Sequence, residues 1–262
     1  GGGLDDAPTV PPEETAAAIS QSLAESTGGT VDEFADAVAL AGGAATEKAR
    51  SRTFRRSRSC TYDDGADLWT CTVEVSGGRG RIETAEFDRT YRAQFFAGEQ
   101  VVRRPAEADS MTFEVVEGKG AFQTPRIDWS HTLHPATWAF AETAPDTYAV
   151  YLRSDEAGRT VNSEVSALQG PRTRTRNATV RKTRTEGLVF RAGDGLVDGT
   201  IEGAYEAEVE IERADGSTVD RSVSVTYAAA FSADGAEITF TGGGERFTGE
   251  SFAFNPTTGE LE

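Results

Sequence analysis

Residues 201–254 decide the fold: IEGAYEAEVEIERADGSTVDRSVSVTYAAAFSADGAEITFTGGGERFTGESFAF. In the first part of this stretch apolar residues alternate with carboxylates, as Tyr205, Ala207, Val209 and Ile211 alternate with Glu206, Glu208, Glu210 and Glu212. A period of two places the apolar set on one face of a β-strand and the acidic set on the other. We therefore predict a strand with one buried face and one face in water.

Two Asp-Gly pairs, Asp215-Gly216 and Asp234-Gly235, interrupt the alternation, which resumes after each of them. Asp-Gly between two alternating runs is a strong hairpin signal, and connections this short join antiparallel neighbours. Similar strand–turn units recur from Thr53 onward at a spacing of roughly 12–16 residues. The sequence predicts a mainly β fold, either a large antiparallel β-sandwich or an open curved sheet, with a short α-helical N-terminal segment.

The N-terminal segment has a helical pattern. A first helix opens at Pro11-Pro12-Glu13-Glu14 and runs to about Ser26, before the stop at Gly28-Gly29, and a capping-box pattern, Thr30-Val31-Asp32-Glu33, opens a second one. Nine acidic residues and no basic residue precede Lys48. We divide the chain into residues 1–47, a tether with two short acidic helices, and residues 48–262, an antiparallel β domain. The basic residues between Lys48 and Arg58 can pair with the acidic helices.

Composition excludes some classes of partner. The 262 residues carry a net charge of −17, which disfavours nucleic acids and anionic membranes as partners. The sequence contains no apolar run of about 18 residues, so we expect no transmembrane segment. Lysine occurs three times and arginine supplies the other basic residues, a usage that indicates a GC-rich bacterial genome.

The N-terminus and the cysteines indicate export. Gly1-Gly2-Gly3 and the polar, Pro-bearing stretch after it resemble the start of a mature bacterial lipoprotein after its lipidated cysteine; a cloning remnant gives the same pattern. Cys60 and Cys71 flank a turn, and a hairpin would bring them close enough for a disulfide. A redox or metal pair is the alternative, without Cys-x-x-Cys spacing to support it. We expect a cell-surface or extracellular protein, or alternatively a periplasmic one.

Residues 122–151 have the least regular pattern and hold three large aromatic residues, Trp129, Trp138 and Phe140. Aromatic residues gathered in an irregular segment are typical of a satellite core beneath a long loop. The alternative is a ligand patch for a sugar or a peptide, or for an apolar molecule.

We find no convincing metal or catalytic motif. Asp128, His131 and His134 lie close in sequence, but Pro135 argues against a helix there and the chain has no third histidine. Two Asp-Gly loops can offer oxygens to calcium, but tight turns require the same residues: Asp63, Asp64 and Asp67, and Asp194 and Asp198. Neither Gly-x-Ser-x-Gly nor a phosphate-binding loop occurs. We expect no enzyme activity, no metal and no cofactor.

Charge is segregated along the chain. A basic stripe contains Arg172, Arg174, Arg176, Arg181, Lys182 and Arg184. Its acidic counterparts are Asp32, Glu33, Asp36, Glu206, Glu208 and Glu210. The stripe is either a solvated sheet edge or face that resists strand pairing or half of a complementary contact between identical copies.

Two functional hypotheses follow. The first is a non-enzymatic exported structural protein, a self-assembling cell-surface or extracellular filament subunit joined by strand-edge pairing and complementary charged faces. The second is an envelope, lipoprotein-like carrier that binds an apolar or carbohydrate ligand in a β concavity. The first predicts a homo-oligomer or homopolymer. The second predicts a monomer with an aromatic-lined hollow.

Overall fold

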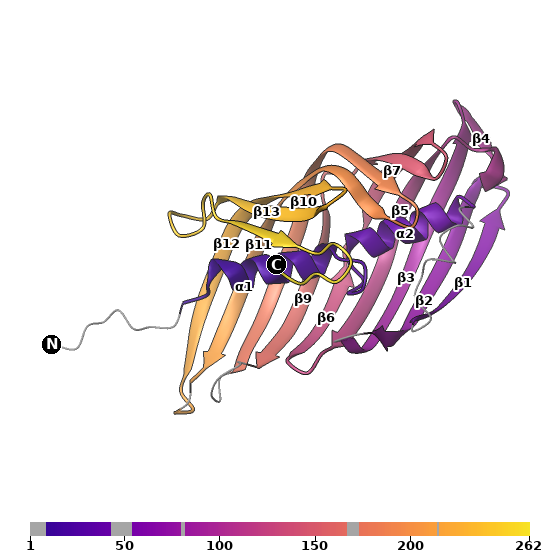
Figure 1. Cartoon of the computed structure of the whole chain (residues 1–262). Coiled ribbons are helices and arrows are strands. Elements are labelled where there is room, and N and C mark those ends of the chain that lie inside the picture. Colours follow the sequence, from indigo (N-terminus) through magenta and orange to yellow (C-terminus); the bar gives the residue numbers. More distant parts are fainter. Residues whose placement is uncertain (1–8, 43–53, 80–81, 167–172, 214) are drawn as a thin grey trace.

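The computed structural model describes residues 9–42, 54–79, 82–166, 173–213 and 215–262. Two helices, α1 (Pro12–Leu23) and α2 (Thr30–Leu40), precede one large antiparallel sheet (Figure 1). Its strands are β1 (Phe54–Asp63), β2 (Leu68–Arg79), β3 (Ile82–Ala97), β4 (Gln100–Val102), β5 (Ser110–Gln123), β6 (Ile127–Leu133), β7 (Ala136–Ala144), β8 (Thr147–Leu152), β9 (Ala157–Ser166), β10 (Thr173–Arg191), β11 (Gly195–Glu212), β12 (Thr218–Ser232), β13 (Gly235–Gly242) and β14 (Ser251–Phe254). A 3₁₀ turn, η1 (Pro105–Glu107), follows β4.

The sheet is a meander of neighbouring strands in the order β1-β2-β3-β5-β6-β9-β10-β11-β12-β13-β14. β7 continues the line of β6, since β5 pairs with β7 through its first half and with β6 through its second. β8 and β9 share a line along β10 in the same way. Pro135 lies at the break between β6 and β7, where its missing N–H donor interrupts the ladder. The prediction of a mainly β, antiparallel fold is confirmed, in its open curved form.

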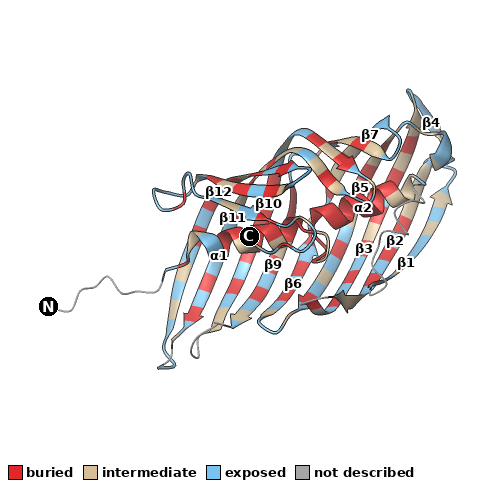
Figure 2. Cartoon of the chain, viewed as in Figure 1, coloured by how far each residue is buried: buried red, intermediate tan, exposed pale blue. Residues whose placement is uncertain are grey.

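The sheet curves around α1 and α2, which lie across its concave face (Figure 1). Buried and exposed residues alternate along the strands, as the bands in Figure 2 show. On β11, Tyr205, Val209 and Ile211 are buried, and Glu206 and Glu208 are exposed on the other face. The period of two read from the sequence therefore corresponds to one covered face and one face in water.

Residues 122–151 are regular, and the prediction of an irregular segment there was wrong. They hold the end of β5, all of β6 and β7, and most of β8. On β6 the buried residues Trp129, His131 and Leu133 alternate with exposed ones. The strand pattern was obscured because a histidine occupies an inward position and Pro135 breaks the run.

The helices share one hydrophobic core with the sheet. Ile19 and Leu23 of α1 and Phe34 and Val38 of α2 are fully buried in it. Neither helix is long and apolar enough to cross a membrane, among the residues that the structure describes. Between them the chain turns at Gly28, whose φ of +69° favours glycine.

The C-terminal segment, residues 255–262, packs against the end of α1. The backbone N–H groups of Glu25 and Ser26 donate to the carbonyls of Pro256 and Thr257 at 3.0 and 2.8 Å. The Ser20 hydroxyl donates to the carbonyl of Gly259 at 2.7 Å. The C-terminal residues of the described chain are therefore bonded to α1 and to the turn that follows it.

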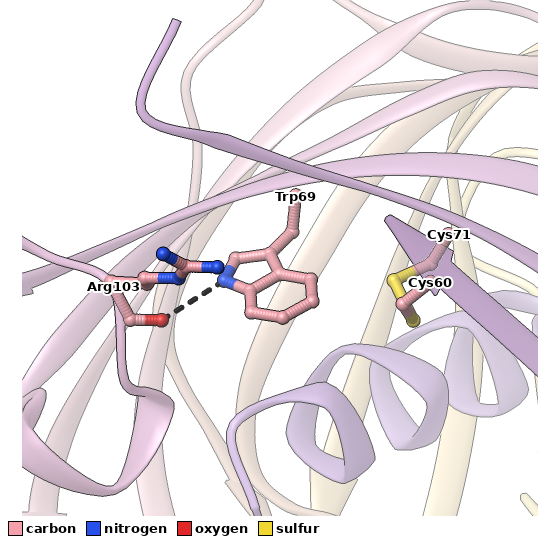
Figure 3. Close-up of a disulfide and its surroundings, with 4 residues drawn as sticks. All are labelled: Cys60, Trp69, Cys71 and Arg103. Atoms are coloured by element: carbon pink, nitrogen blue, oxygen red, sulfur yellow. Dashed lines mark hydrogen bonds between the residues drawn. A yellow bond between two sulfur atoms is a disulfide. The ribbon is translucent and has the colours of Figure 1, made fainter. Parts of the chain in front are cut away.

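Cys60 and Cys71 form the predicted disulfide across β1 and β2 (Figure 3). They are direct partners in the register of the two strands. Trp69, on the same face of β2, donates its indole N–H to the carbonyl of Arg103 at 3.1 Å. The bond ties the edge strand β1 to the rest of the sheet, and it is compatible with an exported protein.

Replacing both cysteines by serine is expected to lower the free energy of unfolding by about 2–3 kcal/mol, because the bond closes a short loop in the unfolded chain. Urea unfolding of the oxidised protein and of the double variant measures the difference. Intact mass after alkylation without reductant should show no free thiol in the wild-type chain. Modification of either cysteine under those conditions would contradict the bond.

Candidate functional site

Four basic side chains lie beneath the helices on the concave face. They are Arg89 on β3, His131 on β6, Arg159 on β9 and Lys182 on β10, and we call them the cationic row. Each is at most 3% exposed. The pairing of Arg89 with Gly118, Gly118 with Leu133 and Leu133 with Arg159 aligns the two arginines across the sheet. His131 lies two residues before Leu133 on β6, and Lys182 pairs with Ala157, two residues before Arg159. The row is therefore a feature of the sheet register and not of any one segment.

Two glycines on β5 make room for the row. A Cβ atom at Gly120 would lie 2.4 Å from the ring of Phe87 and 2.8 Å from that of His131. A Cβ atom at Gly118 would lie 3.1 Å from Cγ of Arg89. Side chains at these two positions would collide with Phe87 and crowd the row. The sheet is thus shaped locally to accommodate the bulky basic side chains.

Three carboxylates of α2 reach down to this face: Asp32, Glu33 and Asp36, which we call the α2 carboxylates. Arg89 Nη1 donates to Asp32 Oδ2 at 2.7 Å and to Asp36 Oδ2 at 3.0 Å. Arg159 pairs with Glu33, and Arg56 of β1 pairs with both aspartates. The pairing of the basic segment before Arg58 with the acidic helices is thereby confirmed at Arg56.

The turn between the helices also contacts the row. The carbonyl oxygen of Gly28 accepts from Arg89 Nη2 at 2.9 Å and from Arg159 Nη1 at 3.1 Å. The Tyr91 hydroxyl donates to Asp36 Oδ2 at 3.0 Å. Charge-assisted bonds of this kind fix the helical hairpin against the sheet.

Burial shifts the pKa values of Lys182 and His131 in the row. Burial lowers the pKa of the Lys182 ammonium group to about 8; Arg159 lowers it further and Glu33 opposes the change. Burial, reinforced by Arg159, Arg89 and Lys182, also holds the pKa of His131 well below its usual range, so its ring is neutral at pH 7. Outside the row, burial also raises the pKa of Tyr205 on β11 to about 12.

Lys182→Met is expected to raise the free energy of unfolding at pH 7 by up to about 3 kcal/mol, because charged Lys182 is buried at a cost. Between about pH 8 and pH 10 the unfolded chain keeps a proton that folded Lys182 has lost. Wild-type stability should therefore rise with pH relative to the variant, whereas below about pH 8 the difference should be constant. Arg159 and Glu33 face Lys182 from β9 and α2, and His131 lies in the same row.

Urea unfolding at pH 7 and pH 9.5 measures this effect. Lys119→Met is the matched control, because the Lys119 side chain is 77% exposed beside Asp88. Equal pH dependence in the wild type and in Lys182→Met would contradict the assignment of a buried, charged lysine.

A second ionic contact holds α1. Glu14 pairs with Arg174 and with Arg176 Nη2 of β10, the latter at 2.6 Å. Arg176 is 4% exposed. The alternating arginines of β10 therefore face the helix, although the sequence suggested a basic outer stripe.

The residues predicted to mediate assembly separate into two sets. The α2 carboxylates, Arg176 and Lys182 are buried between the helices and the sheet, and the side chain of Arg174 is 22% exposed beside Glu14. Arg181 and Arg184 remain accessible, and pair with Glu206 and Glu202. Glu208 and Glu210 are exposed on the outer face of β11. Arg172 lies outside the described residues.

The predicted ligand patch lies in the core. Trp129, Trp138 and Phe140 are at most 1% exposed. The ring of Phe34 on α2 lies 4.8 Å from Trp138 and 5.4 Å from Phe140, edge to face in both pairs. Helix α2 therefore occupies the aromatic part of the concave face that the sequence offered to a ligand.

A cavity of about 190 Å³ opens at the C-terminal end of α2. Its lining comprises Ala41, Gly42, Phe95, Pro105, Ala106, Ala108, Asp109, Ser110, Met111, Phe140, Glu142, Asp146 and Tyr148. Phe140 belongs both to this lining and to the rings under Phe34. The cavity therefore borders, at Phe140, the aromatic face that α2 covers.

The remaining candidates serve local structure. His131 is buried and Asp128 is exposed on the other face of β6, whereas His134 bonds to Thr160 at 2.9 Å. In the first Asp-Gly loop Asp63 accepts from the N–H groups of Gly65 and Ala66. In the second, Asp194 pairs with Arg191 and Asp198 accepts from Gly199. No group of three or more potential ligands is arranged to hold a metal ion within the described ranges.

Sequence reasoning did not identify the cationic row, although a signal was present. Arg89 shares its parity with Phe87 and Tyr91, and Arg159 shares its parity with Val161. A basic residue at an apolar position predicts a buried charge that needs a partner. That signal does not reveal which residue pairs with the buried charge.

Neither a protein-family model, nor a curated protein, nor a solved structure matches this chain.

Proposed function

We propose that this protein is an exported carrier that binds an apolar ligand on the concave face of its sheet. The observation that carries the proposal is the aromatic lining of that face. Its rings come from four strands: Phe34 meets Trp138 and Phe140 of β7 and Phe190 of β10, and Phe113 of β5 and Tyr91 of β3 extend the cluster from Phe140. Such a lining favours an apolar ligand, with carbohydrate as the less suitable class.

The cover over this face is small. Helices α1 and α2 have 12 and 11 residues, lengths at which an isolated helix is marginal in water. Packing and ion pairs against the sheet therefore supply most of their stability. A cover of this kind can be displaced by a ligand that replaces its contacts.

The cavity at the end of α2 supports an entry point. Its volume of about 190 Å³ is below the roughly 300–1,000 Å³ of a complete ligand pocket. As found, it can hold only the end of an apolar chain, against Phe95, Met111 and Phe140, because Asp109, Glu142 and Asp146 make the rest of its lining polar. The rest of the ligand would lie along the aromatic face, once α2 has moved.

Titration with the neutral fluorophore N-phenyl-1-naphthylamine tests the proposal. We expect saturable binding with a rise in emission, because the probe leaves water. Ala106→Trp should weaken this binding about tenfold, since exposed Ala106 lines the cavity and a large ring there fills it. Ala253→Trp, at an exposed position on β14, is the control and should bind like the wild type. Absence of saturable binding in the wild type would reject the carrier.

Self-assembly is the second candidate, and one observation favours it. Strand β1 has ten residues, and in the described part of the chain it pairs with β2 alone. A free edge of that length can pair with a strand of another copy. It ranks second because half of the predicted charged faces are used inside the chain. Light scattering together with negative-stain electron microscopy decides it: ordered polymers support assembly, and a mass of 27.9 kDa at all salt concentrations rejects it.

A further inference from the structure

Lys182 has no carboxylate of its own, because Glu33, the acid within its electrostatic range, is paired with Arg159. The α2 carboxylates bond to arginines, whereas no hydrogen bond or ion pair within the described part of the chain reaches the Lys182 ammonium group. The residue is 1% exposed, so bulk water does not solvate it freely. A buried ammonium group without an anion is costly. Together with Arg56, the charged residues Arg89, Arg159 and Lys182 set four positive charges against the three α2 carboxylates, so this cluster is one negative charge short.

Other polar atoms of the row also lack partners. Both ring nitrogens of His131 and the Nε atoms of Arg89 and Arg159 are buried without a hydrogen bond. Buried donors are normally bonded, so each such atom requires an explanation. These atoms belong to neighbouring strands, and His131 lies within electrostatic range of Arg159, Arg89 and Lys182. One anionic group with several oxygens can satisfy more than one of them.

The α2 carboxylates show what the row accepts. Glu33 meets Arg159, and Asp32 and Asp36 meet Arg89, each through carboxylate oxygens. These acids come from a single short hairpin, whose Gly28 carbonyl also accepts from both arginines. The hairpin thus presents oxygens to the sheet in the manner of an anionic ligand.

We infer that the cationic row is the head-group subsite of the carrier and binds an amphiphile with one anionic head. The head takes the place of the α2 carboxylates on Arg89 and Arg159 and supplies the anion that Lys182 lacks. The apolar chain lies along the aromatic face toward the cavity at the end of α2. Glu33 and Ala41 are eight residues apart on that helix, about 12 Å of axial rise. This inference rests on the proposed function and adds the class of ligand to it.

Binding of cis-parinaric acid and of its methyl ester at pH 7 tests the inference. The two probes share one chain and fluoresce on burial, but only the acid is anionic. We expect the wild-type protein to bind the acid about tenfold more tightly than the ester, the effect of one charge-assisted hydrogen bond. Equal affinity for the two probes would overturn the subsite and leave the carrier intact.

Variants of the row locate the preference. Lys182→Met should bring the acid-to-ester ratio to about one with ester binding retained, and Lys119→Met should keep the wild-type ratio of about ten. Glu33→Gln should raise affinity for the acid, because it removes an internal competitor for Arg159. A ratio that stays at its wild-type value in Lys182→Met would overturn the inference. Failure of both probes to bind the wild type would reject the carrier itself.

Discussion

Arg159→Met is expected to lower the free energy of unfolding by about 3–5 kcal/mol, because it leaves Glu33 charged and buried. Arg159 is fully buried and Glu33 is 3% exposed. In the described chain Arg159 is the partner of the Glu33 carboxylate. The loss is mainly the cost of an unpaired carboxylate, and the contribution of the ion pair itself is smaller. Urea unfolding at pH 7 measures the change.

A double-mutant cycle separates the two contributions. In Arg159→Met with Glu33→Gln neither charge remains, so the double variant should lose at least about 1 kcal/mol less than the sum of the single variants. Arg181→Met is the matched control, because its pair with Glu206 lies on the surface and should cost below about 1 kcal/mol. Additive losses in the cycle would show that the two side chains do not act as a pair.

Phe34→Ala is expected to cost about 3–5 kcal/mol, since it removes a buried ring and leaves a cavity over the aromatic face. Phe34 is fully buried and meets Trp138, Phe140 and Phe190 edge to face. Its loss should also shift tryptophan emission to the red, because Trp138 lies 4.8 Å away. Guanidinium unfolding and the emission spectrum of the folded variant provide the two measurements.

The same variant bears on the carrier. If α2 covers the binding face, Phe34→Ala should bind N-phenyl-1-naphthylamine more tightly than the wild type does. Tyr151→Ala is the control, because Tyr151 is 47% exposed and its loss should cost below about 1 kcal/mol. If Phe34→Ala lost little stability and kept the tryptophan emission of the wild type, the placement of Phe34 in the core would be contradicted.

Local patterns predicted the fold well. The alternation of Tyr205 to Ile211 with acids, the Asp-Gly turns and the spacing of strands are properties of adjacent residues, and each corresponds to an element of the sheet. Helix α2 does begin at Thr30, but its N-cap is Gly29 and no side-chain cap bond forms, so the predicted capping box itself is absent. The disulfide could be predicted for the same reason, because a hairpin brings Cys60 and Cys71 together through local geometry.

The candidate site was less predictable because it depends on register across strands. Arg89, Arg159 and Lys182 are separated by long stretches of sequence, and only the pairing of β3, β5, β6 and β9 aligns the first two. The inward direction of Arg174 and Arg176 was hard to predict for a similar reason, because it depends on a contact with a distant segment. Their strict alternation indicated a strand face correctly, but the choice between inner and outer face depends on α1, which the strand sequence does not contain.

The contact between Ser20 and Gly259 has a consequence for how the chain reaches its folded state. The two residues are separated by 239 positions, so α1 can form this contact only after that length of chain has been synthesised. The arginine partners of both helices are likewise synthesised late: Arg176 long after Glu14 of α1, and Arg159 long after Glu33 of α2. Contacts this distant in sequence slow folding, because a long loop must close before they contribute. The acidic hairpin therefore docks late, onto a sheet that is already largely formed.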